Sequence, residues 1–360
     1  MMLPDEQNTG REAEPVDSLP EDDGSYFPVP LATMQPETNA PVDLYVNMGP
    51  PMDYVLYKAA GTPLRDEMRE RLLEHGVEIL YLRGSDREIY YNYVEQHLRA
   101  ILSDDMLPNH IAAELLYESS SRVMEEVFNN PRTSKNLQRA NDVVQVTVTS
   151  LLRNPDSIWR MTEMAAQDAY TYSHCVQVGM FLVAASRNVL GITDPQMLTR
   201  VGLGGILHDI GKSMVRQDIL NKPGKLTTTE FQEVKKHPDF GEHIVRQHGN
   251  LMPAVAHIVL HHHEHYDGTG YPEGLMGKEL AEVVRLSTLV DVYNALTTDR
   301  PYADAKPPYA ALRTMVEMDG HFDSQLLRSF IQFLGPNPMR RDMRARWHRA
   351  RRQRHIRKAG

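Results

Sequence analysis

Segments with helical periodicity follow one another along most of this chain after residue 86. Several carry their own start signals, since Asp194-Pro195 is a typical N-cap with proline at the first helical position. Thr227 with Glu230 forms a capping box that opens a helix predicted to reach His237. Apolar spacing predicts further helices over 158–189, 253–263, 280–297, 308–318 and 323–334. A succession of helices without alternating strands predicts an all-α domain over residues 157–336.

The first 156 residues are predicted to form three different parts. Residues 1–40 are rich in proline, glutamate and aspartate, so we expect a disordered leader. Residues 41–85 contain two β-prone runs separated by Gly49-Pro50-Pro51, a short helix that stops at Gly76, and the β-prone run VEILYLR. They predict a small α+β module. Residues 86–156 are expected to be helices that connect this module to the main body.

Composition and charge exclude several classes of protein. No apolar run approaches the roughly 20 residues that a membrane helix needs, and the acidic N-terminus lacks the apolar segment of a secretory signal. The single cysteine, Cys175, excludes an intramolecular disulfide framework and fits a reducing compartment, so we expect a cytoplasmic protein. The net charge of −9 argues against a DNA-coating protein. Residues 337–360 nevertheless carry ten bases and one acid, and this basic tail is expected to contact polyanions.

Histidine is the residue type whose distribution points to chemistry, because eight of the 16 histidines lie between His237 and His265. Histidine and aspartate bind divalent first-row metals. The candidate ligands are His174, His208, Asp209, His237, His262, His263 and Asp291. Taken alone, each has an ordinary interpretation as a surface or core residue, and only the combination indicates a metal site. Asp209 is the natural bridging ligand, because a carboxylate can bind two cations whereas an imidazole nitrogen normally does not.

Several long motifs then resemble the HD-GYP family, in the order in which that family has them. They are HDIGK (208–212), ILNKPGKLTTTEF (219–231), KKHPDFG (235–241), HHEHYDGTGYPEGL (262–275) and DVYNALTTDRPY (291–302). YTYSH (170–174) and GHFD (320–323) match as well, and the N-terminal module resembles a domain often found before HD-GYP domains. The resemblance covers about half the chain.

The resemblance implies a bacterial metal-dependent phosphodiesterase that hydrolyses cyclic di-GMP to pGpG and then GMP through a metal-activated hydroxide. It implies two divalent ions, iron or manganese. One would be held by His174, His208, Asp209 and Asp291, and the other by Asp209, His237, His262 and His263. Asp209 and Lys212 are the catalytic candidates, and Lys212, Arg300 and Tyr271 are the expected substrate contacts. Gly270, Tyr271 and Pro272 are also expected to shape a loop that contacts partners.

Three departures from the family pattern bear on these expectations. Tyr170 stands where relatives with a third metal have glutamate, so two ions are expected rather than three. Asn294 and Ala303 replace an aspartate and a basic residue that the family often has, and both are expected on the substrate side. They leave open a catalytically weak nucleotide-binding module that acts by docking to a partner, or a phosphodiesterase for another cyclic dinucleotide. Expected partners are cyclic di-GMP, GGDEF-type or other signalling proteins and a second copy of the chain; no DNA is expected.

Overall fold

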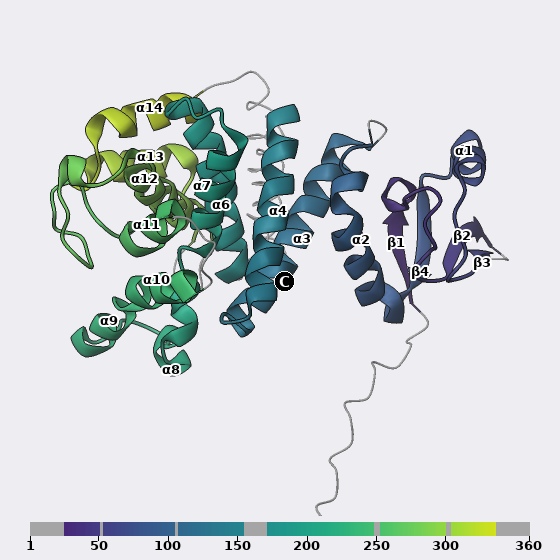
Figure 1. The fold of residues 1–360 in the computed structure, drawn as a ribbon, viewed down its shortest axis with the longest axis horizontal. Coiled ribbons are helices and arrows are strands. Elements are labelled where there is room, and N and C mark those ends of the chain that lie inside the picture. The colour runs from purple at the N-terminus through teal and green to yellow at the C-terminus, as the bar shows by residue number, and fades with distance from the viewer. Residues whose placement is uncertain are drawn as a thin grey trace, which may run out of the picture. The chain divides into compact units, whose positions relative to one another are not determined.

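The computed structural model describes residues 25–50, 53–104, 107–154, 171–247, 253–299 and 304–335 (Figure 1). The chain forms two compact units, Met1–Ile101 and Leu102–Gly360. The predicted fold class is confirmed: a mainly α protein, with an all-α HD-type domain and a small N-terminal α+β module. Tyr170, Arg300, Ala303 and the basic tail lie outside the described residues. Within the described part, no helix is both long and apolar enough to cross a membrane.

The first unit is a four-stranded antiparallel sheet in the order β1-β4-β2-β3, together with two α-helices (Figure 1). Its elements are β1 (Tyr26–Pro30), β2 (Leu44–Gly49), β3 (Asp53–Lys58), α1 (Asp66–Glu74), β4 (Ile79–Arg83) and α2 (Arg87–Ile101), with short 3-10 helices at Leu31–Thr33 and Gly84–Asp86. The two β-prone runs around Gly49-Pro50-Pro51 are β2 and β3, and VEILYLR supplies β4.

The first unit extends further in both directions than the predicted module of residues 41–85. Strand β1 lies inside the segment that was predicted to be a disordered leader. It is ordered because it pairs with β4, where Val29 lies opposite Leu80 and both side chains are fully buried. Helix α2, predicted to be a connector, also belongs to this unit. Its Tyr90 hydroxyl donates to Thr33 at 2.9 Å, and the Tyr93 hydroxyl accepts from the Gln35 backbone N–H at 2.9 Å. Local composition does not reveal a strand whose partner lies 50 residues away.

In its described residues, the second unit is built of helices joined by loops. Its helices are α3 (Asn109–Asn129), α4 (Ser134–Arg153), α6 (Thr171–Val189), α7 (Pro195–Leu207), the 3-10 helix η3 (Ile210–Met214), α8 (Gln217–Leu220), α9 (Thr228–Val234), α10 (His237–Gln247), α11 (Pro253–His261), the 3-10 helix η4 (Gly277–Glu279), α12 (Glu282–Thr297), α13 (Pro308–Glu317) and α14 (Ser324–Leu334).

The helices of the second unit begin at the expected capping residues, with one difference in where a predicted helix ends. The Asp194 side chain accepts from the backbone at the start of α7, and the Thr227–Glu230 capping box opens α9. The helix predicted to run from Thr227 to His237 is instead two helices, since α9 ends at Val234 and α10 begins at His237. Pro238 has no N–H for a helical hydrogen bond, so it fits the first turn of a new helix rather than the interior of a continuing one.

The core of the second unit positions the helices that carry the candidate ligands. Helices α6, α12, α13 and α14 share one apolar cluster, in which the Tyr293 ring packs edge-on against Phe181 and Phe330. Helices α6 and α7 approach closely because glycines meet where they pack, and a Cβ added at Gly205 would lie 2.8 Å from the Gly179 Cα. This contact places the ligand-bearing ends of α6 and α7 side by side.

Candidate metal centre

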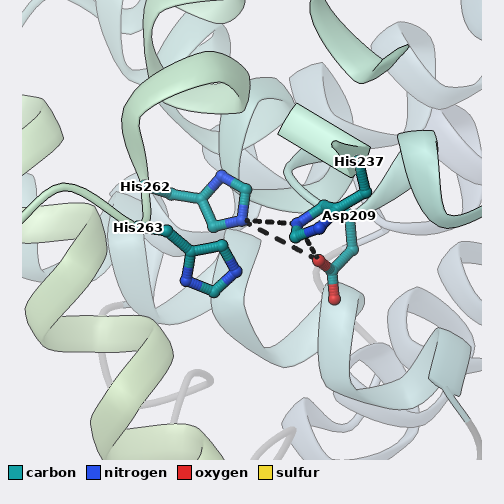
Figure 2. A group of neighbouring side chains, drawn as sticks. All are labelled: Asp209, His237, His262 and His263. Carbon is teal, nitrogen blue, oxygen red and sulfur yellow. Dashed lines mark hydrogen bonds and ion pairs between the residues drawn. The ribbon is translucent and has the colours of Figure 1, made fainter. Parts of the chain in front are cut away.

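The predicted metal ligands converge from separate helices of the second unit. His174 lies in the first turn of α6, and His208 with Asp209 directly follows α7. His237 begins α10, the pair His262-His263 follows α11, and Asp291 lies in α12. The ligand atoms form two groups, and all atoms of a group lie within 4.8 Å of one another. One group, drawn in Figure 2, consists of Asp209, His237, His262 and His263. The other consists of His174, His208 and Asp209.

The Asp209 carboxylate belongs to both groups and turns one oxygen toward each. Its Oδ1 lies 3.2 Å from His237 Nε2 and 3.8 Å from His262 Nε2 (Figure 2). Its Oδ2 lies 3.3 Å from His208 Nε2. Asp291 completes the second group, since its Oδ1 lies 3.1 Å from His174 Nε2 and 3.8 Å from His208 Nε2. This arrangement is suitable for a carboxylate shared by two cations.

Three of the imidazoles have their tautomers fixed by the backbone of their own segments. The Nδ1 atoms of His208, His237 and His262 each donate to a carbonyl three residues earlier, at 2.7, 2.7 and 2.9 Å. In the neutral rings the Nε2 atoms therefore carry lone pairs that face the centre. The Nε2 atoms of His237 and His262 face each other at 3.3 Å, and the buried His208 Nε2 has no hydrogen-bond partner within the described part of the chain. Facing lone pairs repel unless a proton or a cation lies between them, so the donor set fits divalent metal ions.

The protonation states of the centre also suit cation binding. Burial opposes ionisation of Asp209, but His208 and Lys212 hold its pKa well below the usual range. Burial likewise opposes ionisation of Asp291, and its contacts with His174 and His208 lower its pKa in the same way. Burial lowers the pKa of His263 to about 3 and that of His262 well below its usual value. The pKa of His208 is raised instead, because the nearby Asp209 and Asp291 carboxylates outweigh its burial. At neutral pH the centre therefore presents ionised carboxylates and, at His262 and His263, neutral imidazoles, the forms that bind metal.

The segment after Asp209 can approach α10 only because residue 211 is glycine. A Cβ at Gly211 would lie 1.9 Å from the His237 carbonyl oxygen and 2.5 Å from the Gly241 backbone nitrogen. The close approach keeps His237 beside Asp209. The next residue, Lys212, donates from Nζ to Asp209 Oδ2 at 2.5 Å. Burial alone would lower the pKa of Lys212, but the Asp209 carboxylate outweighs burial and raises it. Lys212 therefore remains a cation beside the centre.

The loop that follows His262-His263 covers one side of the centre. The Tyr271 ring stacks on His263 with centroids 4.8 Å apart, and Lys235 Nζ lies 4.7 Å from the Tyr271 ring centroid. The buried Glu264 Oε1 accepts from the backbone N–H groups of Glu273 and Gly274 at 2.7 and 3.0 Å, which fastens the loop. Lys235 and Glu264 lie within the quoted motifs but were not among the predicted site residues.

Asn294 does not lie where the sequence analysis expected it. The prediction that it lies on the substrate side is wrong, since it is 1% exposed and its Oδ1 is 2.7 Å from His174 Nδ1. Its Nδ2 donates to Gln177 Oε1 at 2.5 Å. Gln177 was also missed, and the only available signal was its position one helical turn after His174. The amide of Asn294 therefore belongs to the support of a ligand.

Comparison with known proteins identifies the helical unit. Residues 152–326 match the family model described as HD domain. A 229-residue stretch is 38% identical to "Cyclic di-GMP phosphodiesterase PA4108" of Pseudomonas aeruginosa, covering 63% of this chain and 55% of that protein. This part of the chain matches the HD domain, and its motifs resemble those of the HD-GYP family.

Other similarities of this helical unit to known proteins differ in coverage. A stretch of 197 residues is 32% identical to "3'3'-cGAMP-specific phosphodiesterase 3" of Vibrio cholerae, covering 54% of this chain and 40% of that protein. The chain thus spans between two fifths and little more than half of the length of these two relatives. The solved structure of Bd1817, a HDG"Y"P protein from Bdellovibrio bacteriovorus, has the same fold, with a TM-score of 0.58. It is 23% identical, and the match covers 86% of this chain and 99% of that one.

Proposed function

We propose that this chain is a phosphodiesterase that hydrolyses a cyclic dinucleotide, cyclic di-GMP first among the candidates, at a centre of two divalent metal ions. The observation that carries the proposal is the buried Asp209 carboxylate, which turns one oxygen toward each of two groups of imidazoles. The similarity to proteins named as cyclic di-GMP phosphodiesterases supports the substrate class. His174, His208, Asp209 and Asp291 would hold one ion, and Asp209, His237, His262 and His263 the other.

The chain's own residues would prepare the phosphodiester for attack. When bound, two divalent ions would supply positive charge at the phosphate and lower the pKa of water. Asp209 holds both ligand groups together and keeps its negative charge in the buried centre. Lys212 adds a fixed positive charge beside it, where negative charge on the phosphate develops in the transition state. Tyr271 offers an aromatic edge of the site on which a base could stack. Iron or manganese is the metal that the resemblance to the HD-GYP family implies, and imidazole and carboxylate ligands suit either ion.

The proposal has two forms, which differ only in whether the substrate is cyclic di-GMP or 3'3'-cGAMP. The named relatives include proteins for cyclic di-GMP and for 3'3'-cGAMP, which differ in one base and share the phosphodiester chemistry. The metal ligands act on the phosphate and do not distinguish the bases. We favour cyclic di-GMP because the relative at 38% identity is named for it.

One experiment tests the function and its alternatives together. The full chain is stripped of metal, reloaded with Mn²⁺ or Fe²⁺ under anaerobic conditions, and incubated separately with cyclic di-GMP and 3'3'-cGAMP before chromatography of the products. Metal-dependent appearance of linear dinucleotide from cyclic di-GMP supports the proposal, and faster turnover of 3'3'-cGAMP assigns the other substrate. Binding without turnover of either would support a docking module instead. That alternative has lost part of its basis, because Asn294 supports a ligand rather than facing substrate.

Replacing Lys212 tests the role of the fixed charge. Lys212→Met keeps most of the aliphatic stem and removes the cation, so we expect two ions per chain but a rate lower by about 100-fold to 1,000-fold. Metal content by mass spectrometry and initial rates at limiting and saturating substrate measure both effects. Lys236→Met is the matched control, since Lys236 is exposed and pairs with Glu233. An unchanged rate at both substrate levels would refute the role of Lys212.

The basic tail is proposed to act outside the chemistry. Every proposed ligand lies before residue 301, while residues 337–360 carry a net charge of +9 from ten bases and one acid. A chain ending at Gly335 should keep its metals and its rate on soluble substrate. It should lose salt-sensitive binding to anionic vesicles, since each basic residue near such a surface contributes about 1 kcal/mol. Loss of hydrolysis by a folded truncated chain would place the tail in the active site.

Further partners stay predictions from the sequence. A GGDEF-type or other signalling protein is proposed to contact the loop that contains Gly270, Tyr271 and Pro272. A second copy of the chain is proposed to pair through the helices around 86–152. A cytoplasmic location is proposed from the single cysteine.

A further inference from the structure

One ligand of the proposed centre is oriented differently from the others. His208, His237 and His262 each donate from Nδ1 to a backbone carbonyl three residues earlier, which no side-chain substitution removes. The Nδ1 partner of His174 is a side chain, Asn294 Oδ1 at 2.7 Å, which lies 120 residues later in the sequence. Asn294 follows Asp291 by three residues on α12, so this helix supplies both a ligand and the support of another ligand.

The orientation of the Asn294 amide is set by its second contact. Asn294 Nδ2 donates to Gln177 Oε1 at 2.5 Å, and Thr298 Oγ1 donates to the same oxygen at 3.3 Å. The amide oxygen is therefore the atom that faces His174, and an oxygen can only accept there. With the amide in this orientation, His174 carries its hydrogen on Nδ1, which leaves Nε2, 3.1 Å from Asp291 Oδ1, with the lone pair that a cation needs. All three supporting side chains are less than a tenth exposed, so water does not compete for these bonds.

We propose that Asn294 is a positioning residue that fixes the tautomer of His174 and thereby sets the affinity of the ion held by His174, His208, Asp209 and Asp291. The inference rests on the proposed metal centre and deepens it. Polar groups that orient a metal-bound histidine contribute about 10-fold to 100-fold in metal affinity. A neutral amide orients the ring but draws the Nδ1 hydrogen less strongly than a carboxylate does, so Asn294 holds that affinity below the value a carboxylate would give.

The surroundings of Asn294 can accept a carboxylate. Gln177 Nε2 is buried without a hydrogen-bond partner among the described residues. If Asn294→Asp removes the donor that faces Gln177, the Gln177 amide can rotate and donate Nε2–H to the new carboxylate oxygen. The substitution therefore keeps the acceptor for His174 and supplies a partner for the added oxygen. Asn294→Leu, of similar volume, removes the acceptor altogether.

The test measures metal binding without any substrate. The metal-free full chain and its variants are titrated with Mn²⁺ by calorimetry, and Co²⁺ absorption spectra report the ligand field of each site. We expect two binding events in the wild type. In Asn294→Leu one of them should weaken by about 10-fold to 100-fold, with the other unchanged. Asn294→Asp should bind that ion at least as tightly as the wild type. Ser287→Ala is the matched control, a buried polar residue of α12 whose hydroxyl donates within its own helix, and it should leave both affinities unchanged.

The outcomes separate the inference from the function on which it rests. Unchanged affinities for both ions in a folded Asn294→Leu chain would overturn the positioning role while leaving the metal centre intact. Equal weakening in Asn294→Asp and Asn294→Leu would also overturn it, because a merely structural residue gains nothing from the restored acceptor. A wild-type chain that binds no divalent ion would overturn the proposed centre itself, and the inference with it.

Discussion

Asp209→Asn should remove hydrolysis and weaken at least one metal by more than about 100-fold, since even residues that only orient a ligand contribute 10-fold to 100-fold. The amide keeps the shape of the carboxylate, but its nitrogen cannot bind a cation and its charge is lost. The carboxylate turns Oδ1 toward His237 and Oδ2 toward His208, so one substitution damages both groups. Two cations that lose the negative charge between them would also repel each other.

The measurement for Asp209→Asn pairs metal content with turnover. Metal per chain is determined after dialysis against a weak chelator, and hydrolysis of cyclic di-GMP is followed by chromatography. Asp218→Asn serves as the control, because Asp218 is an exposed aspartate that pairs with Arg216 away from the centre. Two retained metals together with full turnover in Asp209→Asn would remove Asp209 from the site.

Gly211→Ala should destabilise the helical unit by about 3 kcal/mol, the upper end of the usual cost of overpacking. The added methyl would lie 1.9 Å from the His237 carbonyl oxygen and 2.5 Å from the Gly241 nitrogen. Both neighbours are backbone atoms, so rotation of a side chain cannot relieve the clash and the start of α10 must move. Since His237 begins α10, we also expect loss of the ion held by His237, His262 and His263.

A second glycine separates the loss of metal from a loss of stability alone. Gly191→Ala meets no atom within 4 Å, but Gly191 has a φ of +68°, so the substitution should cost only the roughly 1–2 kcal/mol of left-handed backbone strain. Urea denaturation and metal content are compared for the two variants and the wild type. Gly191→Ala should keep both ions. If Gly211→Ala is as stable as the wild type and also keeps both, then the close approach to α10 does not organise the site.

The sequence by itself determined the helical class of the main domain and the chemical types of the ligands. Caps and proline positions act within a few residues, so Asp194-Pro195 and Thr227 with Glu230 marked their helices correctly. The motifs around His208 and His262 indicated candidate ligands, because histidine and aspartate within apolar segments need a polar partner or a metal ion. The division of those ligands between two ions came from the family resemblance, and the structure brings the side chains together.

Only the tertiary structure decided which distant residues support those ligands. Strand β1 is defined by its pairing with β4, some 50 residues later, and local composition carries no trace of that partner. Asn294 faces His174 across 120 residues, although its sequence context had suggested a substrate contact. Gly211 matters because a backbone carbonyl from α10 lies against it. Short-range signals fix helices and residue types, whereas the orientation of a side chain depends on packing between helices, which arises only when the chain has folded.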